Sequence, residues 1–465
     1  MRMSNIIGLP LRAIYLVGLC GAFATAEPPC VKSSPEVKAV LDAARKSAEE
    51  TKDTYVRSEL LHEVAKGYAA NGDFDSAVQV IRVDSRLMWH ASDDLARDML
   101  RCGESAQVKA IAPTLQGRSK SLMLQWLAEW DAKHEDPTGS QAALSQIEDA
   151  DIRNEAQFNI ITRRAVEGDA KVAEVEYRRI VDAADSGQVS ADDLVAGDMA
   201  VLYVMKGDVD SASASINKMK SGEKVFSLYT AIQIMAEKKD KAGADRLSKA
   251  ALRIAHPFLK DPDQAYPISL LATALAKLGM FDDAIELANA IPDTQRRDEA
   301  LVMIATYLIA DKQESRARTL MDSLSKLPDS NGALDGERQM AWVRFAMAQA
   351  NAGDGEGALK TLEVARDPRM DSLSKWQRAY AEARAGRSAQ GRDLALQIAS
   401  EFPRDERGRA LRLVAAVNAH EKGASDVMSW ASQLSAPEDR VSAYLGVADG
   451  LLGNPTQEIP PYFQD

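Results

Sequence analysis

Long apolar runs and aromatic residues are scarce in this 465-residue chain. Beyond Ala24, no stretch approaches the roughly eighteen consecutive apolar residues that a membrane-spanning helix needs. We therefore expect no integral membrane segment in the mature protein. Phe, Trp and Tyr make up 6% of the residues, which is few for a carbohydrate-active enzyme with an aromatic cleft. Hydrophobic residues still reach 46%, which excludes wholesale disorder.

Clusters of basic residues are missing too. The formal net charge is −12. Residues 1–26 hold Arg2 and Arg12 but no acid, so their removal would bring the charge to −14. Binding to nucleic acid or to anionic lipid requires clustered Lys and Arg. We therefore predict no nucleic-acid partner.

Residues 1–26 have the features of an export signal. Arg2 and Arg12 provide a basic start, residues 13–24 form a short apolar run, and Ala24-Thr25-Ala26 supplies small residues at a cleavage point. The alternative is a retained N-terminal anchor. The export signal predicts a secreted protein. Asn-x-Ser/Thr acceptor sites with a permitted middle residue are absent, which favours a bacterial periplasm over a eukaryotic secretory route.

Cysteine is rare, and signal cleavage would leave only Cys30 and Cys102 of the three. In an oxidising compartment such a pair indicates a possible disulfide. The bridge would close a loop of about 72 residues and stabilise the fold by about 4 kcal/mol in the chain-entropy model. The alternative is a disordered Cys30 and a Cys102 buried as a small apolar residue.

Internal repetition is the dominant feature that is present. Residues 271–291 (LATALAKLGMFDDAIELANAI) predict a helix, a turn at Leu278-Gly279 and a second helix. Variants recur about every 35 residues. Glycine, which tolerates the left-handed conformation common just after a helix, occupies eight of the twelve turn positions. These positions are Gly72, Gly103, Glu135, Gly168, Gly207, Lys239, Gly279, Lys312, Gly353, Gly386, Lys422 and Gly453.

Alanine recurs at two fixed distances from these turns. Only a small side chain lets two antiparallel helices of one hairpin cross at about 8–10 Å, so we expect these alanines to be packing positions. Seven residues before a turn stand Ala65, Ala96, Ala128, Ala200, Ala272, Ala305, Ala346, Ala379 and Ala415. Five residues after a turn stand Ala77, Ala173, Ala212, Ala244, Ala284, Ala317 and Ala358.

Residues 65–77 (AKGYAANGDFDSA) resemble the tetratricopeptide repeat. That family has a small residue, then an aromatic three later, Gly at seven, an aromatic at nine and Ala at twelve. The segment supplies Ala65, Tyr68, Gly72, Phe74 and Ala77 in those places. Residues 200–212 and 272–284 match in part, but the proline that usually ends each repeat is mostly missing. The resemblance implies a right-handed superhelix whose concave groove binds peptides or proteins without catalysis.

We therefore predict an all-α fold, an α-solenoid of about eleven helix hairpins. Ser34 and Pro35 are suited to cap and begin a leading helix. The final helix, 438–452, is followed by three prolines and so has no second helix to pair with; we expect it to cap the array. The predicted organisation is a signal peptide at 1–26, a leader and helix at 27–53, the solenoid at 54–453 and a Pro-rich extended tail at 454–465.

In such an array, one face of the first helix of each hairpin lines the groove. The stripe carries Thr, Gln, Met and aromatic residues with few charges, and aromatic and Met side chains are good partner anchors. The alternative is that these residues pack between repeats as ordinary core. The predicted partner-binding residues are Tyr229, Gln233, Tyr266, Thr273, Thr306, Met347, Trp376 and Tyr380.

No residue pattern indicates catalysis, a metal or a cofactor. The five histidines are scattered and form no His-x-x-x-His pair, and there is no Asp-rich calcium loop. We predict a non-catalytic scaffold or adaptor of the bacterial cell envelope that binds a protein or peptide partner. One alternative is a secreted carbohydrate-active enzyme with an α/α toroid, against which the regular turn-to-alanine spacing counts. Another is the superhelical part of a peptidoglycan-processing machine, which would need an enzyme partner.

Overall fold

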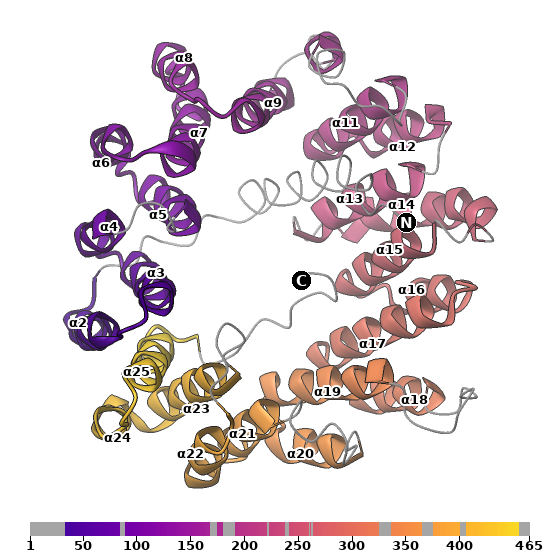
Figure 1. The fold of residues 1–465 in the computed structure, drawn as a ribbon. Helices are drawn as coiled ribbons and strands as arrows, with labels where there is room; N and C mark the ends of the chain where they lie inside the picture. Colours follow the sequence, from indigo (N-terminus) through magenta and orange to yellow (C-terminus); the bar gives the residue numbers. More distant parts are fainter. Residues whose placement is uncertain are drawn as a thin grey trace, which may run out of the picture. The chain divides into compact units, whose positions relative to one another are not determined.

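Every regular element that the computed structural model describes is a helix, and none of the described residues lies in a β-strand, so the chain is all-α as predicted (Figure 1). The described residues are 33–83, 89–167, 174–179, 191–220, 223–237, 241–259, 261, 264–324, 336–364, 375–399 and 406–454. The predicted signal peptide, Cys30 and the tail beyond Asn454 lie outside them. Within these ranges, no helix combines the length and the apolar character that crossing a bilayer requires.

The chain divides into two compact units. Unit 1 contains residues 157–332, and unit 2 contains residues 29–156 together with 333–465, as far as they are described. The turn spacing continues through both units and gives no sign of this division.

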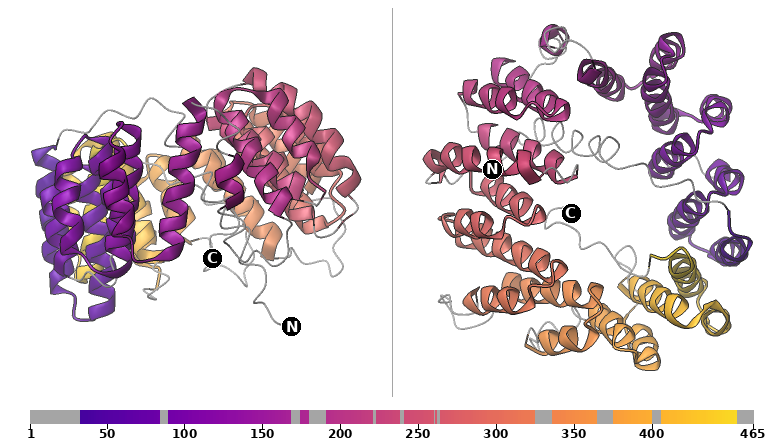
Figure 2. Two further views of the ribbon diagram at one scale, coloured as in Figure 1. Left: turned by 90° about the horizontal axis from the view of Figure 1, so that it is seen from above. Right: turned by 180° about the vertical axis from the view of Figure 1, so that it is seen from behind.

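In unit 1 the helices form two layers (Figures 1 and 2). The first layer contains α11 (Ala191–Lys206), α13 (Glu223–Glu237), α15 (Ala265–Lys277) and α17 (Thr294–Ala310). The second contains α12 (Val209–Lys218), α14 (Lys241–Ala255) with the 3-10 turn η2 (His256–Phe258), α16 (Phe281–Asn289) and α18 (Glu314–Leu324). Each first-layer helix contacts the next one in its layer as well as its own hairpin partner.

Unit 2 is built from both ends of the described chain. The earlier part contains α2 (Pro35–Glu50), α3 (Thr54–Ala70), α4 (Phe74–Val83), α5 (Trp89–Arg101), α6 (Ser105–Ile111), η1 (Ala112–Thr114), α7 (Gly117–Lys133), α8 (Pro137–Ser145) and the start of α9 (Ala150–Glu167). The later part contains α19 (Gly336–Asn351), α20 (Gly355–Val364), α21 (Lys375–Arg384), α22 (Ser388–Leu396), α23 (Glu406–Lys422), α24 (Ala424–Ser432) and α25 (Pro437–Leu451).

The predicted turn recurs throughout the described chain. Nine of the twelve predicted positions have positive φ, namely seven of the glycines and two non-glycine residues, Glu135 (58°) and Lys312 (62°). At each of the nine, the next residue donates its backbone N–H to the carbonyl five positions back, as Asp73 does to Tyr68 at 2.9 Å. This bond closes a helix end in the Schellman manner. At the end of α23 the left-handed residue is Gly423, one position later than predicted. Gly168 and Lys239 lie outside the described residues.

The two alanine columns are packing positions, as predicted. All nine alanines before the turns are at most 2% exposed, and the six described alanines after the turns are fully buried. A larger side chain at such a place would push the two helices of a hairpin apart.

The last helix, α25, forms as predicted for residues 438–452, but the expectation that it has no helix to pair with is wrong. α25 packs on α2 and also contacts α3 and α23 (Figure 1). The sequence contains one single helix near each end, and each of them carries an apolar stripe that would otherwise face water. On α2 this stripe includes Val37, Val40, Leu41, Ala44 and Ala48, all of them buried. Each single helix thus supplies the partner that the other lacks.

Candidate partner-binding face

Three neighbouring helices of unit 1 share a partly exposed stripe. α13, α15 and α17 lie side by side, and each buries its opposite side. Residues three, four or seven apart fall on one face of a helix, and at this spacing the side chains are half-buried on all three helices. We call this surface the aromatic face. It consists of Phe226, Tyr229 and Gln233 of α13, Tyr266, Leu270 and Thr273 of α15, and Met303 and Tyr307 of α17.

Neighbouring side chains orient the rings of the aromatic face. The rings of Phe226 and Tyr229 meet at 57° with their centroids 5.7 Å apart. The guanidinium of Arg296, on α17, lies 5.2 Å from the ring centroid of Tyr266, on α15, a cation–π arrangement. Arg296 Nη1 also donates to Glu299 Oε2 at 2.9 Å. Rings held in this way lose little further freedom when a partner docks.

The polar groups of the aromatic face suit neutral hydrogen bonding. Burial raises the pKa of the Tyr266 and Tyr307 hydroxyls, so both stay protonated at neutral pH and can donate. The Gln233 amide offers both a donor and an acceptor. The Thr273 hydroxyl donates to Ser269 O of its own helix at 2.9 Å, which leaves its methyl group for contact.

Four of the eight predicted partner-binding residues, Tyr229, Gln233, Tyr266 and Thr273, thus lie on one continuous set of helices. The other four are buried. These are Thr306 (8% exposed), Met347 (6%), Trp376 (9%) and Tyr380 (0%). The last three belong to one apolar core cluster of unit 2. A buried side chain offers no surface to a partner, so we do not carry these four into the proposed binding site.

A carboxylate cluster in unit 2 is a second candidate that was not singled out from the sequence. Trp126 Nε1 donates to Asp93 Oδ1 at 2.6 Å, and Gln125 Nε2 donates to the buried Glu129 at 3.3 Å. Burial raises the pKa of Glu155 and the charge of Asp93 adds to this effect, against the hydrogen bond with Gln125. The signal was available, because Asp93 and Glu129 lie ten and six residues before their turns, as the predicted groove residues do.

Cys102 forms a disulfide bond. Its predicted partner, Cys30, lies outside the described residues, so the pairing of these two stays a prediction. The bond places Cys102 among structural cysteines and not among free nucleophiles.

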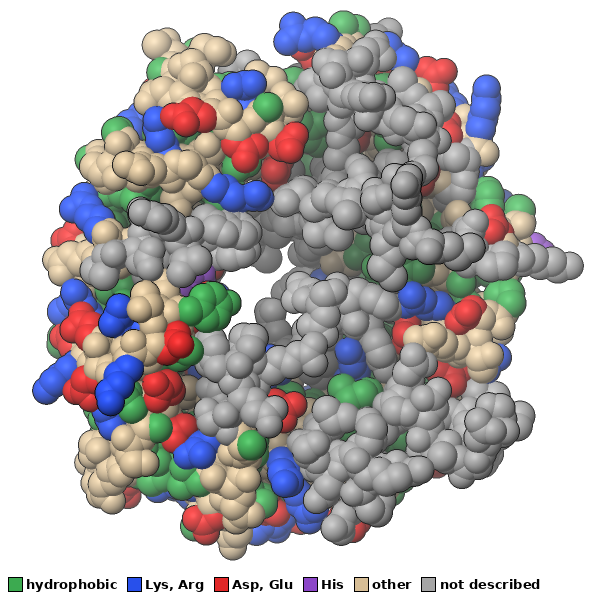
Figure 3. All heavy atoms as spheres, in the orientation of Figure 1, with side chains coloured by type: hydrophobic (Ala, Val, Ile, Leu, Met, Phe, Trp, Pro, Cys, Tyr) green, Lys and Arg blue, Asp and Glu red, His purple; other side chains and the backbone are tan. Residues whose placement is uncertain are grey.

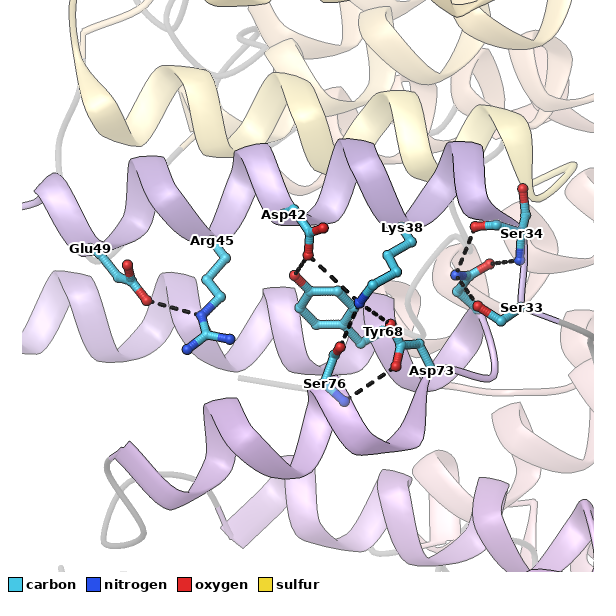
Figure 4. A network of polar contacts seen from close by, with 10 residues as sticks. Ser33, Ser34, Lys38, Asp42, Arg45, Glu49, Tyr68, Asp73 and Ser76 are labelled. Atoms are coloured by element: carbon cyan, nitrogen blue, oxygen red, sulfur yellow. Dashed lines mark hydrogen bonds and ion pairs between the residues drawn. The ribbon is translucent and has the colours of Figure 1, made fainter.

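A polar network ties α2 to α3 and α4 (Figure 4). Lys38 Nζ lies 2.5 Å from Asp73 Oδ2 and 2.7 Å from Ser76 Oγ, and the hydroxyl of the fully buried Tyr68 donates to Asp42 Oδ1 at 2.6 Å. Burial alone would raise the pKa of Asp73, but the hydrogen bonds from Lys38 and Ser76 hold it below its ordinary value. Because Lys38 is paired with the carboxylate of Asp73, we interpret this network as a structural one that holds the three helices together.

Asp73→Asn is expected to flatten the acid dependence of stability. Because the folded state lowers the pKa of Asp73, its carboxylate stabilises the fold at pH values above the ordinary pKa of 3.8. This contribution is lost as the pH falls below 3.8 through the lowered pKa of the folded state. The variant should be about 1 kcal/mol less stable at pH 7, and this difference should shrink as the pH falls below 3.8. Asn remains a good cap for the Ser76 N–H. Urea unfolding from pH 7 to 3 measures this, and parallel pH curves for the two proteins would refute it.

The charge of the surface gives no further clue to a partner. On the side that Figure 3 shows, acidic and basic side chains of the described residues lie intermingled. Among the described residues, no three His, Cys, Asp or Glu side chains come together as metal ligands would.

No model of a known protein family matches the chain, and no curated protein sequence matches it significantly.

Proposed function

We propose that this protein is a non-catalytic scaffold or adaptor of a bacterial cell envelope that binds a protein or peptide on the aromatic face. Its build would be a tetratricopeptide-like α-solenoid, exported by the signal at residues 1–26. The recurring left-handed turn and the two buried alanine columns support the solenoid. The observation that carries the binding proposal is the aromatic face itself.

Binding would follow from burial, with no covalent chemistry. The rings of Tyr229 and Tyr266 and the flexible side chain of Met303 present apolar surface that water still reaches, and a docked partner would cover it. At protein interfaces a few central aromatic anchors dominate the binding energy, and truncating one of them costs about 2 kcal/mol or more. Gln233 and the tyrosine hydroxyls would pair with backbone groups of an extended or helical segment.

Combined substitution of Tyr229, Tyr266 and Met303 by serine is expected to weaken partner capture from an envelope extract at least about tenfold. A matched control changes the exposed Lys249 and Arg318 of the second layer to serine; it should capture the partner as the parent chain does. Melting curves of both variants establish that unit 1 is folded. Equal capture by the aromatic-face variant and the control would refute the assignment.

The alternative, a secreted carbohydrate-active enzyme with an α/α toroid, has two observations in its favour. The first and last described helices pair with each other, as closure of a toroid requires. The carboxylate cluster also combines a candidate acid, Glu155, with Asp93 and with Trp126, a side chain suited to stacking on a sugar. Hydrolysis of a polysaccharide by the parent chain, lost in Glu155→Gln, would favour this function over the scaffold.

A further inference from the structure

Side chains of the aromatic face form rows that run across its three helices, which lie side by side (Figure 1). In an array of equivalent hairpins, residues equally far before their turns lie at the same level of neighbouring first helices. The turns after α15 and α17 have positive φ at Gly279 and Lys312, and the turn after α13 is predicted at Lys239. Nine or ten residues before these turns stand Tyr229, Leu270 and Met303, which we call the apolar row. Five or six residues before them stand Gln233, Thr273 and Tyr307, which we call the polar row.

The two rows differ in chemistry and lie close together. The apolar row presents an aromatic ring, a branched aliphatic chain and a thioether, all of them half-buried. In the polar row the Thr273 hydroxyl donates within its own helix, so the donors offered to a ligand are the Gln233 amide and the Tyr307 hydroxyl. The rows are about one helical turn, or about 5–6 Å, apart. A segment that crosses the helices can therefore place side chains on one row and its backbone along the other.

The part of the aromatic face that holds both rows is uncharged. Residues 229–234, 269–274 and 302–307 contain no Asp, Glu, Lys or Arg. Nearer the start of α17, Arg296 and Glu299 pair with each other at 2.9 Å. A charged group of a ligand would lose water on these rows without gaining an opposite charge. Charge complementarity therefore requires a ligand that is neutral where it crosses them.

The distance between the helices favours one backbone conformation of the ligand. Packed helices lie about 8–10 Å apart, so the positions of each row repeat at about that distance. In the polyproline II conformation every third residue returns to the same side after about 9.3 Å. A β-strand returns to the same side after about 6.6–6.8 Å, which does not match. An α-helix needs about 10.5 Å, or seven residues, which matches nearly as well as polyproline II.

The polar row distinguishes polyproline II from an α-helix. The backbone groups of an α-helix are bonded within the helix, so they would leave the donors of Gln233 and Tyr307 without partners. A polyproline II backbone has no internal hydrogen bonds, and its carbonyls are open to such donors. Proline also lacks an N–H and so requires no acceptor from the face. Its flat apolar ring suits contact with an aromatic ring such as that of Tyr229.

We propose that the aromatic face binds a proline-rich segment in the polyproline II conformation, which lies across α13, α15 and α17. Every third side chain contacts the apolar row, and backbone carbonyls accept hydrogen bonds from Gln233 and Tyr307. This inference rests on the proposed function and names the chemical class of the partner. A segment that already prefers this conformation loses little entropy upon binding.

Fluorescence anisotropy of the full chain with two labelled peptides tests the ligand class. The probe is a peptide of four Pro-Pro-Leu repeats with a lysine at each end for solubility. The control has four Ala-Ala-Leu repeats and the same ends, so it keeps the leucine spacing but favours a helix. We expect the Kd of the Pro-Pro-Leu peptide to be at least about tenfold lower than that of the control.

Three substitutions test the placement of the peptide. Leu270→Ser, in the middle of the apolar row, should weaken binding of the Pro-Pro-Leu peptide about tenfold. Tyr307→Phe and Gln233→Ala should each weaken it about three- to tenfold, because each removes one donor. Tyr203→Phe is the matched control, since its ring packs against a buried cluster on α11, and should leave the Kd unchanged. Melting curves verify that each variant is folded, and Tyr307→Phe alone suffices if Leu270→Ser is not.

Two results would overturn the inference. One is binding of the Ala-Ala-Leu peptide as tightly as the Pro-Pro-Leu peptide or more tightly, which would favour a helical ligand. The other is binding of the Pro-Pro-Leu peptide that Tyr307→Phe, Gln233→Ala and Leu270→Ser all leave unchanged. The proposed function is tested separately by partner capture from the envelope extract. Capture that depends on the aromatic face, without preference for the Pro-Pro-Leu peptide, would remove this inference and leave the proposed function standing.

Discussion

Gly446→Ala is expected to destabilise unit 2 by about 1–3 kcal/mol, and Gly446→Leu by more. A β-carbon at Gly446 would lie 2.0 Å from the Arg412 carbonyl oxygen and 2.8 Å from the Ala415 β-carbon. No side-chain rotation relieves a clash with backbone, so α25 and α23 would have to separate. Four residues on, a β-carbon at Gly450 would lie 2.4 Å from the Ala416 carbonyl oxygen, so the close approach continues along the helix.

The expected destabilisation is opposite in sign to the usual effect of Gly→Ala in a helix. In an exposed helix, Gly→Ala stabilises by about 1 kcal/mol. Gly197→Ala in α11 is the matched control, because the nearest atom to its β-carbon would be the rotatable Ser227 hydroxyl at 3.0 Å; this change should be neutral or stabilising. Urea unfolding of both variants measures the difference. A Gly446→Ala protein as stable as its parent would show that α25 does not pack on α23 in this way.

Tyr380→Ala is expected to cost about 3–5 kcal/mol of stability, as the removal of other buried aromatic side chains does. Tyr380 is fully buried, and its hydroxyl donates to Asn351 Oδ1 at 2.8 Å. Tyr380→Phe keeps the ring and loses only this bond, so it should cost about 1 kcal/mol. The half-buried Tyr229 should cost clearly less than Tyr380 when changed to alanine.

Thermal or urea unfolding measures how much stability Tyr380→Ala, Tyr380→Phe and Tyr229→Ala each lose, and Tyr380→Ala should lose the most. This order separates the two roles that sequence allows for Tyr380. A groove residue would lose its partner upon substitution and leave stability nearly intact, whereas a core residue loses stability first. A Tyr380→Ala protein with unchanged stability would return Tyr380 to the binding surface.

Local chemistry explains why the turns and alanines were predictable. A left-handed residue after a helix favours glycine, and a close helix crossing requires a small side chain, so both leave a mark at fixed spacing. The spacing identified even Glu135 and Lys312, which have positive φ without being glycine. The helical fold follows from the same pattern.

The pairing of α2 with α25 left no such mark, because no spacing relates residues almost 400 positions apart. The sequence also did not show which of the predicted groove residues reach water. Six residues before the turn, Gln233 and Thr273 are half-buried, whereas Thr306 and Tyr380 are buried. Helical register places a side chain on a face, but the neighbouring helices decide whether that face reaches water. The carboxylate cluster escaped notice because single acids are common in a chain with 69 of them.

Site-specific photo-crosslinking in cells of the source organism tests the proposed binding role of the aromatic face most directly. A photoreactive residue would replace Gln233, Thr273 or Met303, one on each helix of the face, and in parallel Lys249 or Arg318 on the second layer. We expect the same partner to be crosslinked from all three positions of the aromatic face and from neither control. No partner adduct from the three positions, or equal adducts from α14 and α18, would contradict the proposed function.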